Sequence, residues 1–351
     1  MIGSREKLLE LAAAGELFGE SAEGLDLRGV DLSGLDLSQC SFVACDLTGA
    51  DLSDCLLSDA SLRGSDLSGA KLNRTELFGC DVCGVRLFGA LLEAATLNEV
   101  NLSGVDLREA ALDGAELTQV DLTGANLSSL DLSDARLSSR RLAGCDLRGT
   151  RLLLANLSGA DLRETLLDRK TSFVQCLFEA ADLSEVDLRE LDLRLSNFAG
   201  ANLQRARLER SSLAQVGFAG ANLTDASLSG ASAANSDFQG AVLNRADLSQ
   251  AQLRQSNFTN CSALGTRFSG CDLTQACFVK ADLSGSTLIH CVLRYADCSH
   301  SVLERCDFGF ADLEYANLHR ARLGQSSLRG ATTGNISMTD PQREAAEDFS
   351  P

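Results

Sequence analysis

Residues 196–223 read SNFAGANLQRARLERSSLAQVGFAGANL, and this stretch shows the pattern that decides the fold. A Leu or Phe, here called the centre, recurs every five residues, and a small residue stands two positions before it. Centre and small residue point to the same side of an extended chain, because side chains alternate along a strand. Since five is an odd number, a straight strand would put the next centre on the opposite face. The chain must therefore turn within every five-residue unit.

The phenylalanines indicate how many units make one turn of the chain. Every fourth centre in this part of the sequence is phenylalanine, namely Phe178, Phe198, Phe218, Phe238, Phe258 and Phe278. This recurrence of the bulkiest residue predicts that four units close one coil, so that like side chains stack at roughly 4.8 Å spacing. We therefore expect a four-sided solenoid with these rings in a single internal column.

The repeat covers most of the chain and has one break. Centres fall every five residues from Leu27 to Leu167 and from Phe173 to Leu328, but the step between Leu167 and Phe173 is six. We predict a cap at 1–24, a first repeat segment at 25–167, a bulge or widened corner at 168–172, a second repeat segment at 173–330 and a polar, disordered or weakly helical tail at 331–351. The repeats predict one rod of about 15 coils, on the order of 70 Å long.

The repeated unit also resembles a known family. The segments ADLSD at 50–54 and ANLSS at 125–129 are similar to the A(D/N)LSG repeat of the pentapeptide-repeat family. The resemblance covers about residues 25–330 and implies an all-β fold, a right-handed quadrilateral β-helix. Composition and spacing do not indicate that handedness.

The N-terminal residues predict a short capping helix over residues 4–14. Ser4 suits the N-cap and Gly15 the stop. The first coil of a solenoid exposes an apolar end, so we expect this helix, with Leu17 and Phe18, to cover it. A docking or targeting role is the alternative.

The cysteines and the termini favour a reducing compartment. Ten of the 13 cysteines fall at the small inward position, where Cys behaves as a compact hydrophobe. We expect free thiols even at Cys271 and Cys291, which would be stacked neighbours. The chain shows no apolar run of the ~20 residues that span a bilayer and no signal-cleavage pattern. These features predict a cytoplasmic protein without membrane attachment.

Charge is concentrated toward the N-terminus. The net charge is −18, and residues 1–135 hold 24 acidic against 8 basic residues. Such a surface repels nucleic-acid phosphate, so we expect no direct nucleic-acid binding. We expect a protein partner, for which a basic surface would match this charge, and the sequence does not indicate an oligomeric state.

One candidate surface is an acidic column. If four units make one coil, outward residues at equivalent places in successive coils stack, which aligns Asp26, Asp46, Asp66 and Asp106. The column could attract a basic partner. Alternatively, each Asp could simply bond the backbone at its own turn.

Two further candidate surfaces are apolar or aromatic. The outward apolar residues near the six-residue step are Leu153, Leu154, Val174 and Leu195, and contiguous exposed apolar residues often mark an interface. Near the C-terminal end, Tyr295 stacks on Tyr315 and His290 on Phe310, which suits a contact surface or simply covers the last coils.

The sequence shows no catalytic, cofactor or metal constellation. The histidines His290, His300 and His319 are predicted on separate columns. Arg140 falls at a small inward position, where an unpaired guanidinium is costly, so we expect a local distortion or an acidic partner there.

These features favour a non-catalytic scaffold that binds another protein along one face. A second hypothesis follows from the resemblance, because some family members mimic DNA and bind DNA gyrase or topoisomerase IV, protecting them from quinolones or toxins. A third is an accessory or effector protein of a bacterial secretion system. Fold-level analogy does not decide among them.

Overall fold

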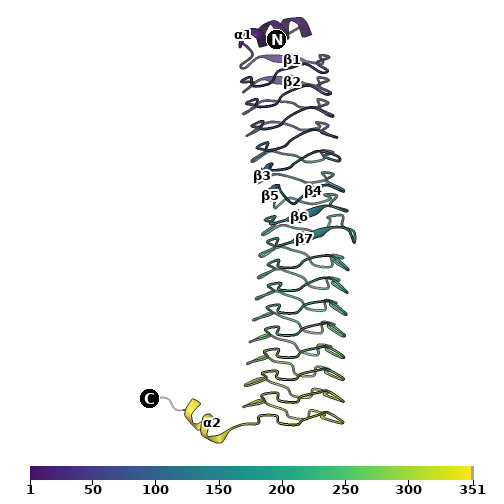
Figure 1. Cartoon of the computed structure of the whole chain (residues 1–351), viewed down its shortest axis with the longest axis vertical. Coiled ribbons are helices and arrows are strands. Elements are labelled where there is room, and N and C mark those ends of the chain that lie inside the picture. The colour runs from purple at the N-terminus through teal and green to yellow at the C-terminus, as the bar shows by residue number, and fades with distance from the viewer. Residues whose placement is uncertain (349–351) are drawn as a thin grey trace. The chain divides into compact units, whose positions relative to one another are not determined.

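The computed structural model of the chain describes residues 1–348, so the last three residues of the predicted tail lie outside the described part. The chain forms two compact units, Met1–Cys176 and Leu177–Pro351, and each is described by itself. Within each unit, successive turns of the chain stack on one another (Figure 1).

Stacking is parallel, and each residue pairs with the equivalent residue four units along the chain, here called the four-unit register. Asp26 is bridged to Asp46 in the first unit, and Asn202 to Asn222 in the second. Most contacts between turns are single bridges. The longer strands are β1 (Ser21–Glu23), β2 (Ser41–Val43), β3 (Glu116–Thr118), β4 (Asp131–Leu132), β5 (Arg136–Ser138), β6 (Arg151–Leu153) and β7 (Ser172–Val174). This register is the one that the phenylalanine spacing predicted.

Each corner is closed by local bonds between one five-residue repeat and the next. The carbonyl of the centre Leu47 accepts the N–H of Ala50 at 2.9 Å, and Gly49 between them has a φ of 65°. A residue with positive φ is needed in such a turn, which explains the frequent Gly at the last position of the unit. The Asp before the centre adds a second local bond, as Asp51 Oδ1 does by accepting the Ser53 N–H.

The core of the second unit contains the predicted phenylalanine column. Adjacent rings from Phe178 to Phe278 have centroids 4.5–5.4 Å apart and are tilted by at most 18°. All six side chains are fully buried. The prediction of a single internal file is confirmed, and the stacking adds to the apolar area that these rings remove from water.

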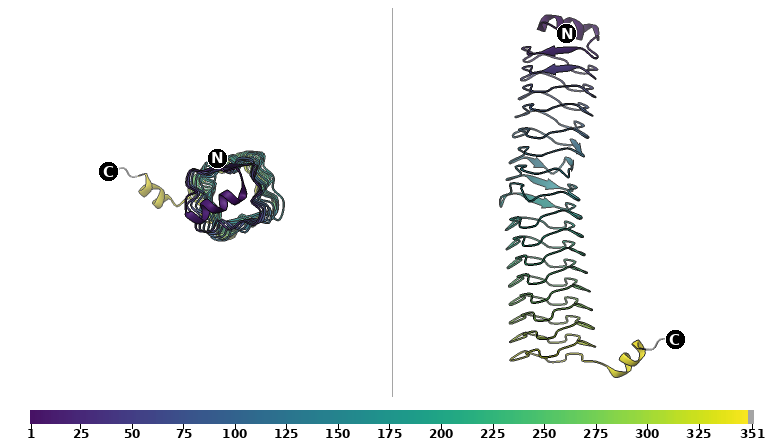
Figure 2. Two further views of the ribbon diagram at one scale, coloured as in Figure 1. Left: turned by 90° about the horizontal axis from the view of Figure 1, so that it is seen from above. Right: turned by 180° about the vertical axis from the view of Figure 1, so that it is seen from behind.

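The predicted N-terminal helix is present as α1 (Arg5–Ala14). Ser4 Oγ accepts the N–H of Lys7, and Gly15, with a φ of 70°, donates its N–H to the Ala12 carbonyl. Seen from above, α1 lies across the end of the first unit, and its Leu8 is fully buried (Figure 2). Phe18 is exposed. The ladder already begins inside the region predicted as cap, since β1 pairs with β2.

The extra residue at 168–172 is absorbed in a turn closed by one carboxylate. Asp168 Oδ1 accepts the N–H groups of Gly149, Lys170 and Thr171. β4, β6 and β7 form one sheet, in which β7, at the end of the insertion, pairs with β6 in a register that is longer by one, with Leu152 opposite Phe173. The insertion thus lengthens one turn and leaves the stacking intact.

At the C-terminal end, the ladder continues beyond residue 330, where the sequence predicted the repeat to end. Thr332 and Ser337 are bridged to the preceding turn. Helix α2 (Pro341–Glu347) follows, with Asp340 as its N-cap. It has no buried residue and projects away from the stacked turns of this unit (Figure 1).

Replacing one ring of the column tests its contribution to stability. Phe238→Ala should lower the free energy of unfolding by about 3–5 kcal/mol, because it leaves a cavity that the rigid neighbouring turns cannot close. Urea denaturation measures the change. The control Phe78→Ala removes a ring that is 49% exposed and should have a much smaller effect. Equal losses in the two variants would contradict the assignment of the column as core.

Candidate functional site

The main irregularity of the first compact unit lies at Arg140. The repeat places this residue at the small inward position. The structure places Ser139 inside instead, and Arg140 is exposed. Ser139 Oγ donates to the Val120 carbonyl at 2.9 Å and accepts the Arg141 N–H at 3.1 Å. The exchange avoids burying an unpaired guanidinium. Of the two outcomes expected for Arg140, the local distortion is the one observed.

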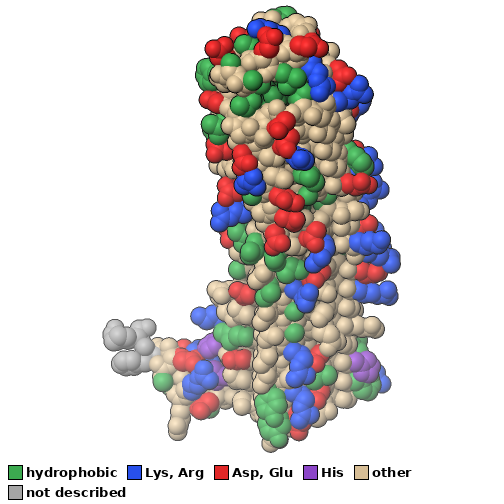
Figure 3. Space-filling view, turned by 45° about the horizontal axis from the view of Figure 1, so that its top comes forward, with side chains coloured by type: hydrophobic (Ala, Val, Ile, Leu, Met, Phe, Trp, Pro, Cys, Tyr) green, Lys and Arg blue, Asp and Glu red, His purple; other side chains and the backbone are tan. Residues whose placement is uncertain are grey.

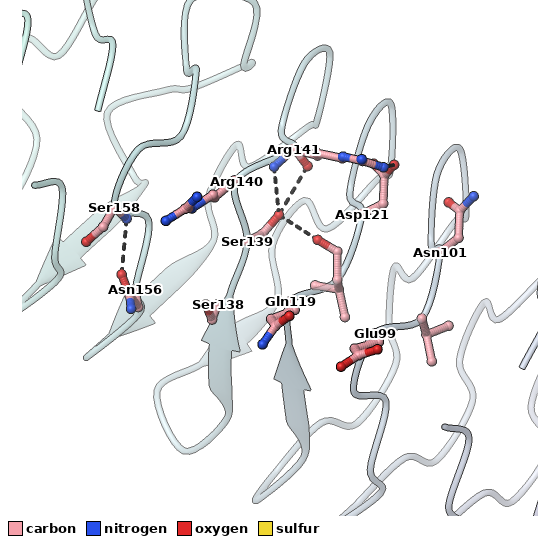
Figure 4. Close-up of a pocket in the computed structure, with 12 residues that line it drawn as sticks. Glu99, Asn101, Gln119, Asp121, Ser138, Ser139, Arg140, Arg141, Asn156 and Ser158 are labelled. Carbon is pink, nitrogen blue, oxygen red and sulfur yellow. Dashed lines mark hydrogen bonds and ion pairs between the residues drawn. The ribbon is translucent and has the colours of Figure 1, made fainter. Parts of the chain in front are cut away.

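The exchange shifts the pairing register and opens a groove. β3 pairs with β5 in the four-unit register, with Thr118 opposite Ser138, but on its other side Ser138 is bridged to Asn156, two positions short of that register. The Ser139 N–H donates to the Asn156 carbonyl at 3.2 Å. The resulting groove, here called the Arg140 groove, has a volume of about 720 Å³ (Figure 4). It is lined by Glu99, Val100, Asn101, Gln119, Val120, Asp121, Ser138, Ser139, Arg140, Arg141, Asn156 and Ser158.

The groove offers two charged groups that are not engaged. Within residues 1–348, neither the Arg140 guanidinium nor the Glu99 carboxylate forms an ion pair, whereas the neighbouring Arg141 pairs with Asp121 at 3.0 Å. Arg140 extends toward the loop that carries Ser158 (Figure 4), where its Nε would lie 3.6 Å from a Cβ built on Gly159. A free guanidinium suits a bidentate bond to a carboxylate.

Part of the predicted apolar surface borders this groove. Leu153 pairs with Val174 between β6 and β7, and the Leu154 N–H donates to the Val174 carbonyl at 3.2 Å. These three residues are here called the Leu154 strip. Leu154 is 68% exposed, has a φ of 58°, and lies two residues before Asn156 in the groove wall. Leu195, the fourth predicted residue, belongs to the second unit and is 46% exposed.

The acidic column is assembled as the register requires, but its charges are compensated. Arg28 donates to Asp26 and lies 3.5 Å from Asp46, and Arg86 lies 3.3 Å from Asp66. Further along, Arg108 forms two bonds to Asp106. Asp26, Asp46, Asp66 and Asp106 each also accept a backbone N–H two residues on. On the face shown in Figure 3, acidic and basic side chains are likewise interspersed.

The aromatic pairs of the second unit stack as the spacing predicted. Tyr295 and Tyr315 have ring centroids 4.9 Å apart and nearly parallel planes, and His290 lies 5.2 Å from Phe310. Both tyrosines and Phe310 are exposed. Phe310 also covers the next corner, because a Cβ added at Gly330 would lie 2.7 Å from its ring. A covering role and a contact role are both compatible with this geometry.

The prediction that separate columns keep the histidines apart is wrong for two of them. The backbone N–H of His300 donates to the backbone carbonyl of His319 at 2.8 Å, and the two ring centroids are 5.6 Å apart. They occupy neighbouring positions of one corner on successive turns. Glu347 of α2 approaches both rings. The four-unit register aligns position 300 with position 320, so it could have placed His300 beside His319, whereas no sequence signal indicated Glu347, because the tail that carries it has no repeat register.

All 13 cysteines are free thiols, as expected. Cys271 and Cys291 donate to the carbonyls of Leu248 and Phe268, both at 2.8 Å. Burial raises the pKa of Cys298 to about 12. At neutral pH such a thiol is protonated and therefore unreactive.

Stacked parallel turns, an apolar column inside and polar corners outside define the class of this protein as a β-helical solenoid. Eight copies of the model described as pentapeptide repeats match residues 45–84, 86–124, 101–138, 131–169, 176–215, 221–260, 251–288 and 291–330. The chain therefore belongs to the pentapeptide-repeat family, whose members fold as right-handed β-helices.

Several solved structures are similar to this chain. HetL from the cyanobacterium Nostoc sp. strain PCC 7120, a protein involved in the regulation of heterocyst differentiation, is 23% identical over 97% of this chain and 98% of its own, with a TM-score of 0.25. QnrB1, a plasmid-mediated fluoroquinolone resistance protein, is 16% identical over 67% of this chain and 92% of its own, with a TM-score of 0.30. Rfr23 from the cyanobacterium Cyanothece 51142 is 26% identical over 32% of this chain and 92% of its own, with a TM-score of 0.25. No curated protein matches the sequence. None of the described helices has the length and apolar character needed to cross a bilayer.

Arg140→Ala tests the origin of the groove. Alanine is suited to the inward position, so residue 140 should replace Ser139 inside and restore the four-unit register. We expect the groove to close and the stability to rise by about 1 kcal/mol, roughly the gain from burying one methyl group. A crystal structure of the variant and its urea midpoint provide the two measurements. A groove that persists unchanged in the variant would show that Arg140 does not cause it.

The arginine-paired carboxylates predict loss of stability in acid. Hydrogen bonds from Arg28, Arg108 and Arg148 hold the pKa values of Asp26, Asp106 and Asp146 below their usual range. Because the folded-state values lie below the unfolded value of about 3.9, this stabilisation is complete above that pH and is lost as pH falls through the folded-state values. The urea midpoint should therefore be similar at pH 7 and 5 and decrease below about pH 4.

A charge-removing variant provides the control. Arg148→Gln should lower the midpoint at pH 7, and its difference from the unmodified chain should shrink as pH falls through the lowered pKa of Asp146, because a protonated carboxyl gains little from the guanidinium. A midpoint that is the same at pH 2 and pH 7 would contradict the assignment.

Proposed function

We propose that this protein is a non-catalytic scaffold that binds a segment of another protein along the Arg140 groove and the adjoining Leu154 strip. The observation that carries this proposal is that the guanidinium of Arg140, unpaired within the described residues, and the largely exposed side chain of Leu154 lie in the same compact unit, Met1–Cys176. Both features depart from the repeat, which places small residues at the register of Arg140 and often a Gly at the register of Leu154.

Leu154 presents an apolar side chain to solvent at a left-handed corner and is 68% exposed. Left-handed backbone costs a residue with a Cβ about 1–2 kcal/mol, and Leu154 shares this conformation with many other non-glycine corners of the described chain, such as Leu195 and Tyr295. Burying the Leu154 side chain under a partner would gain about 1.5–3 kcal/mol. The exposed leucine therefore adds little to folding and is suited to an interface.

The Arg140 groove adds specificity to this surface. A partner segment that presents a carboxylate to Arg140 and an apolar side chain to Leu154 would match both groups. The walls of the groove are held by backbone bonds between turns, so the surface is formed before the partner arrives, which lowers the entropic cost of association.

This geometry ranks the groove above the acidic column. The four predicted aspartates already have arginine neighbours, so the column supports attraction of a basic partner such as a topoisomerase less well than the net charge suggested. We also propose that the cross-section is closed and four-sided, that the repeats form about 15 coils in total, and that the protein is cytoplasmic.

Leu154→Asn separates binding from folding. Asn tolerates left-handed backbone, so we expect the variant to be at least as stable as the unmodified chain. Its binding to the partner should weaken by at least tenfold, which corresponds to about 1.4 kcal/mol. Partners are first identified by affinity capture from the native host with mass spectrometry, and binding of each purified candidate is then measured by calorimetry.

Two further variants sharpen the result. Arg140→Glu should also weaken binding, because it places a carboxylate against the partner's acid. Leu264→Asn removes a leucine of the second unit that is 39% exposed and should leave binding unchanged. If Leu154→Asn and Leu264→Asn bind equally well, the proposed surface is wrong.

A further inference from the structure

Three side chains at the C-terminal end of the second unit converge on one point. His300 and His319 come from successive turns, and Glu347 comes from the last turn of α2. Their candidate ligand atoms all lie within 4.8 Å of one another. We propose that His300, His319 and Glu347 bind a divalent transition-metal ion, with Zn²⁺ as the best match. This site is independent of the proposed function, which lies in the first unit.

The distances match the ligand separations of a metal ion, although without an ion His319 and Glu347 share a long hydrogen bond. Glu347 Oε2 lies 3.4 Å from His300 Nε2 and 3.3 Å from His319 Nε2. Hydrogen bonds between such atoms are usually about 2.9–3.0 Å long. In contrast, two ligands of tetrahedral Zn²⁺ with bonds of about 2.0–2.2 Å are separated by about 3.3–3.5 Å. The ligand atoms of the two imidazoles lie up to 4.8 Å apart, which is longer than this separation, so the two rings must also move closer together for an ion to bind all three atoms.

The ligand types select the class of ion. Two imidazoles and one carboxylate suit Zn²⁺, Ni²⁺ or Cu²⁺, whereas Mg²⁺ and Ca²⁺ prefer oxygen ligands. The set leaves a fourth tetrahedral position for water or for a ligand from another molecule. His319 is 2% exposed, so one ligand is already held in place before an ion binds.

The surrounding charges allow a cation to bind. Arg320 and Arg343 contact Glu347, but Arg320 is also bonded to Asp348 at 2.8 Å and lies 3.7 Å from Glu344. Three carboxylates therefore face two guanidinium groups around the site. The local balance is negative before an ion enters, and Arg320 keeps acidic partners when Glu347 turns to the metal.

Binding requires one rearrangement, which gives the proposal a structural signature. His319 Nδ1 accepts the Asp340 N–H at 3.2 Å, so its proton is on Nε2. Coordination through Nε2 moves that proton to Nδ1 and breaks the bond from Asp340. The ion would then tie the end of α2 to the last turns, while the Asp340 N–H at the start of the helix loses its partner. Because α2 has no buried residue, this link would be its strongest attachment.

The test is titration of the reduced chain with ZnCl₂ under anaerobic conditions, followed by calorimetry. We expect one site, with affinity reduced at least tenfold in Glu347→Gln and in His300→Gln. Both substitutions are at partly exposed positions and should leave the urea midpoint unchanged, so a loss of folding cannot imitate a loss of binding. His290→Gln, which alters a histidine outside the cluster, should bind Zn²⁺ normally.

Cobalt provides a second readout. Bound Co²⁺ should show the weak visible bands of nitrogen and oxygen ligands, and Zn²⁺ should slow amide hydrogen exchange at 344–347. An intense near-ultraviolet thiolate band would instead assign the ion to cysteines and overturn the proposal. Equal affinity in the unmodified chain and in Glu347→Gln, or no binding at all, would overturn it as well.

Discussion

The structure depends on one constraint that recurs every five residues: the chain must change direction without leaving a backbone group unpaired. It meets this constraint with a bond from the small residue of one unit to the preceding centre, and with a left-handed residue between them. The remaining N–H and C=O groups are directed to the turns above and below. Parallel stacking, the internal column and the outward columns all follow from this corner.

Because the repeat keeps a strict register, each departure from it points to a local physical cause. The small inward position accepts Ala, Ser, Cys, Thr or Val, and a guanidinium cannot occupy it without a partner. At Arg140 the chain moves by one residue, buries Ser139 and loses two positions of register against Asn156. The cost of desolvating one charge thus creates the groove of the first unit. The Asp168 turn shows the opposite case, in which an extra residue is absorbed and the core is unchanged.

Local bonds also determine how the charged side chains of the surface are used, so the net charge alone does not indicate which surface binds a partner. Aspartate before the centre accepts a backbone N–H at its own corner, and an arginine from the same unit or from the next turn often reaches a neighbouring carboxylate. Much of the acidic character is therefore used in holding corners and joining turns. Binding capacity is better sought where a side chain has no such local role, as at Leu154 and at the cluster around Glu347.

The sequence alone determined the repeat length, the four-unit register, the phenylalanine column and the N-terminal helix, because each depends on spacing or on a local cap. It also indicated that Arg140 was misplaced. Only the tertiary structure decided that Ser139 takes the inward position in place of Arg140. The energy of each side chain in the core depends on how far the adjacent turns can shift to accept it. The register could have placed His300 beside His319, but the approach of Glu347 to both was hidden from the sequence. The residues of α2 lie outside the repeat, so their position is set by side-chain contacts that no period predicts.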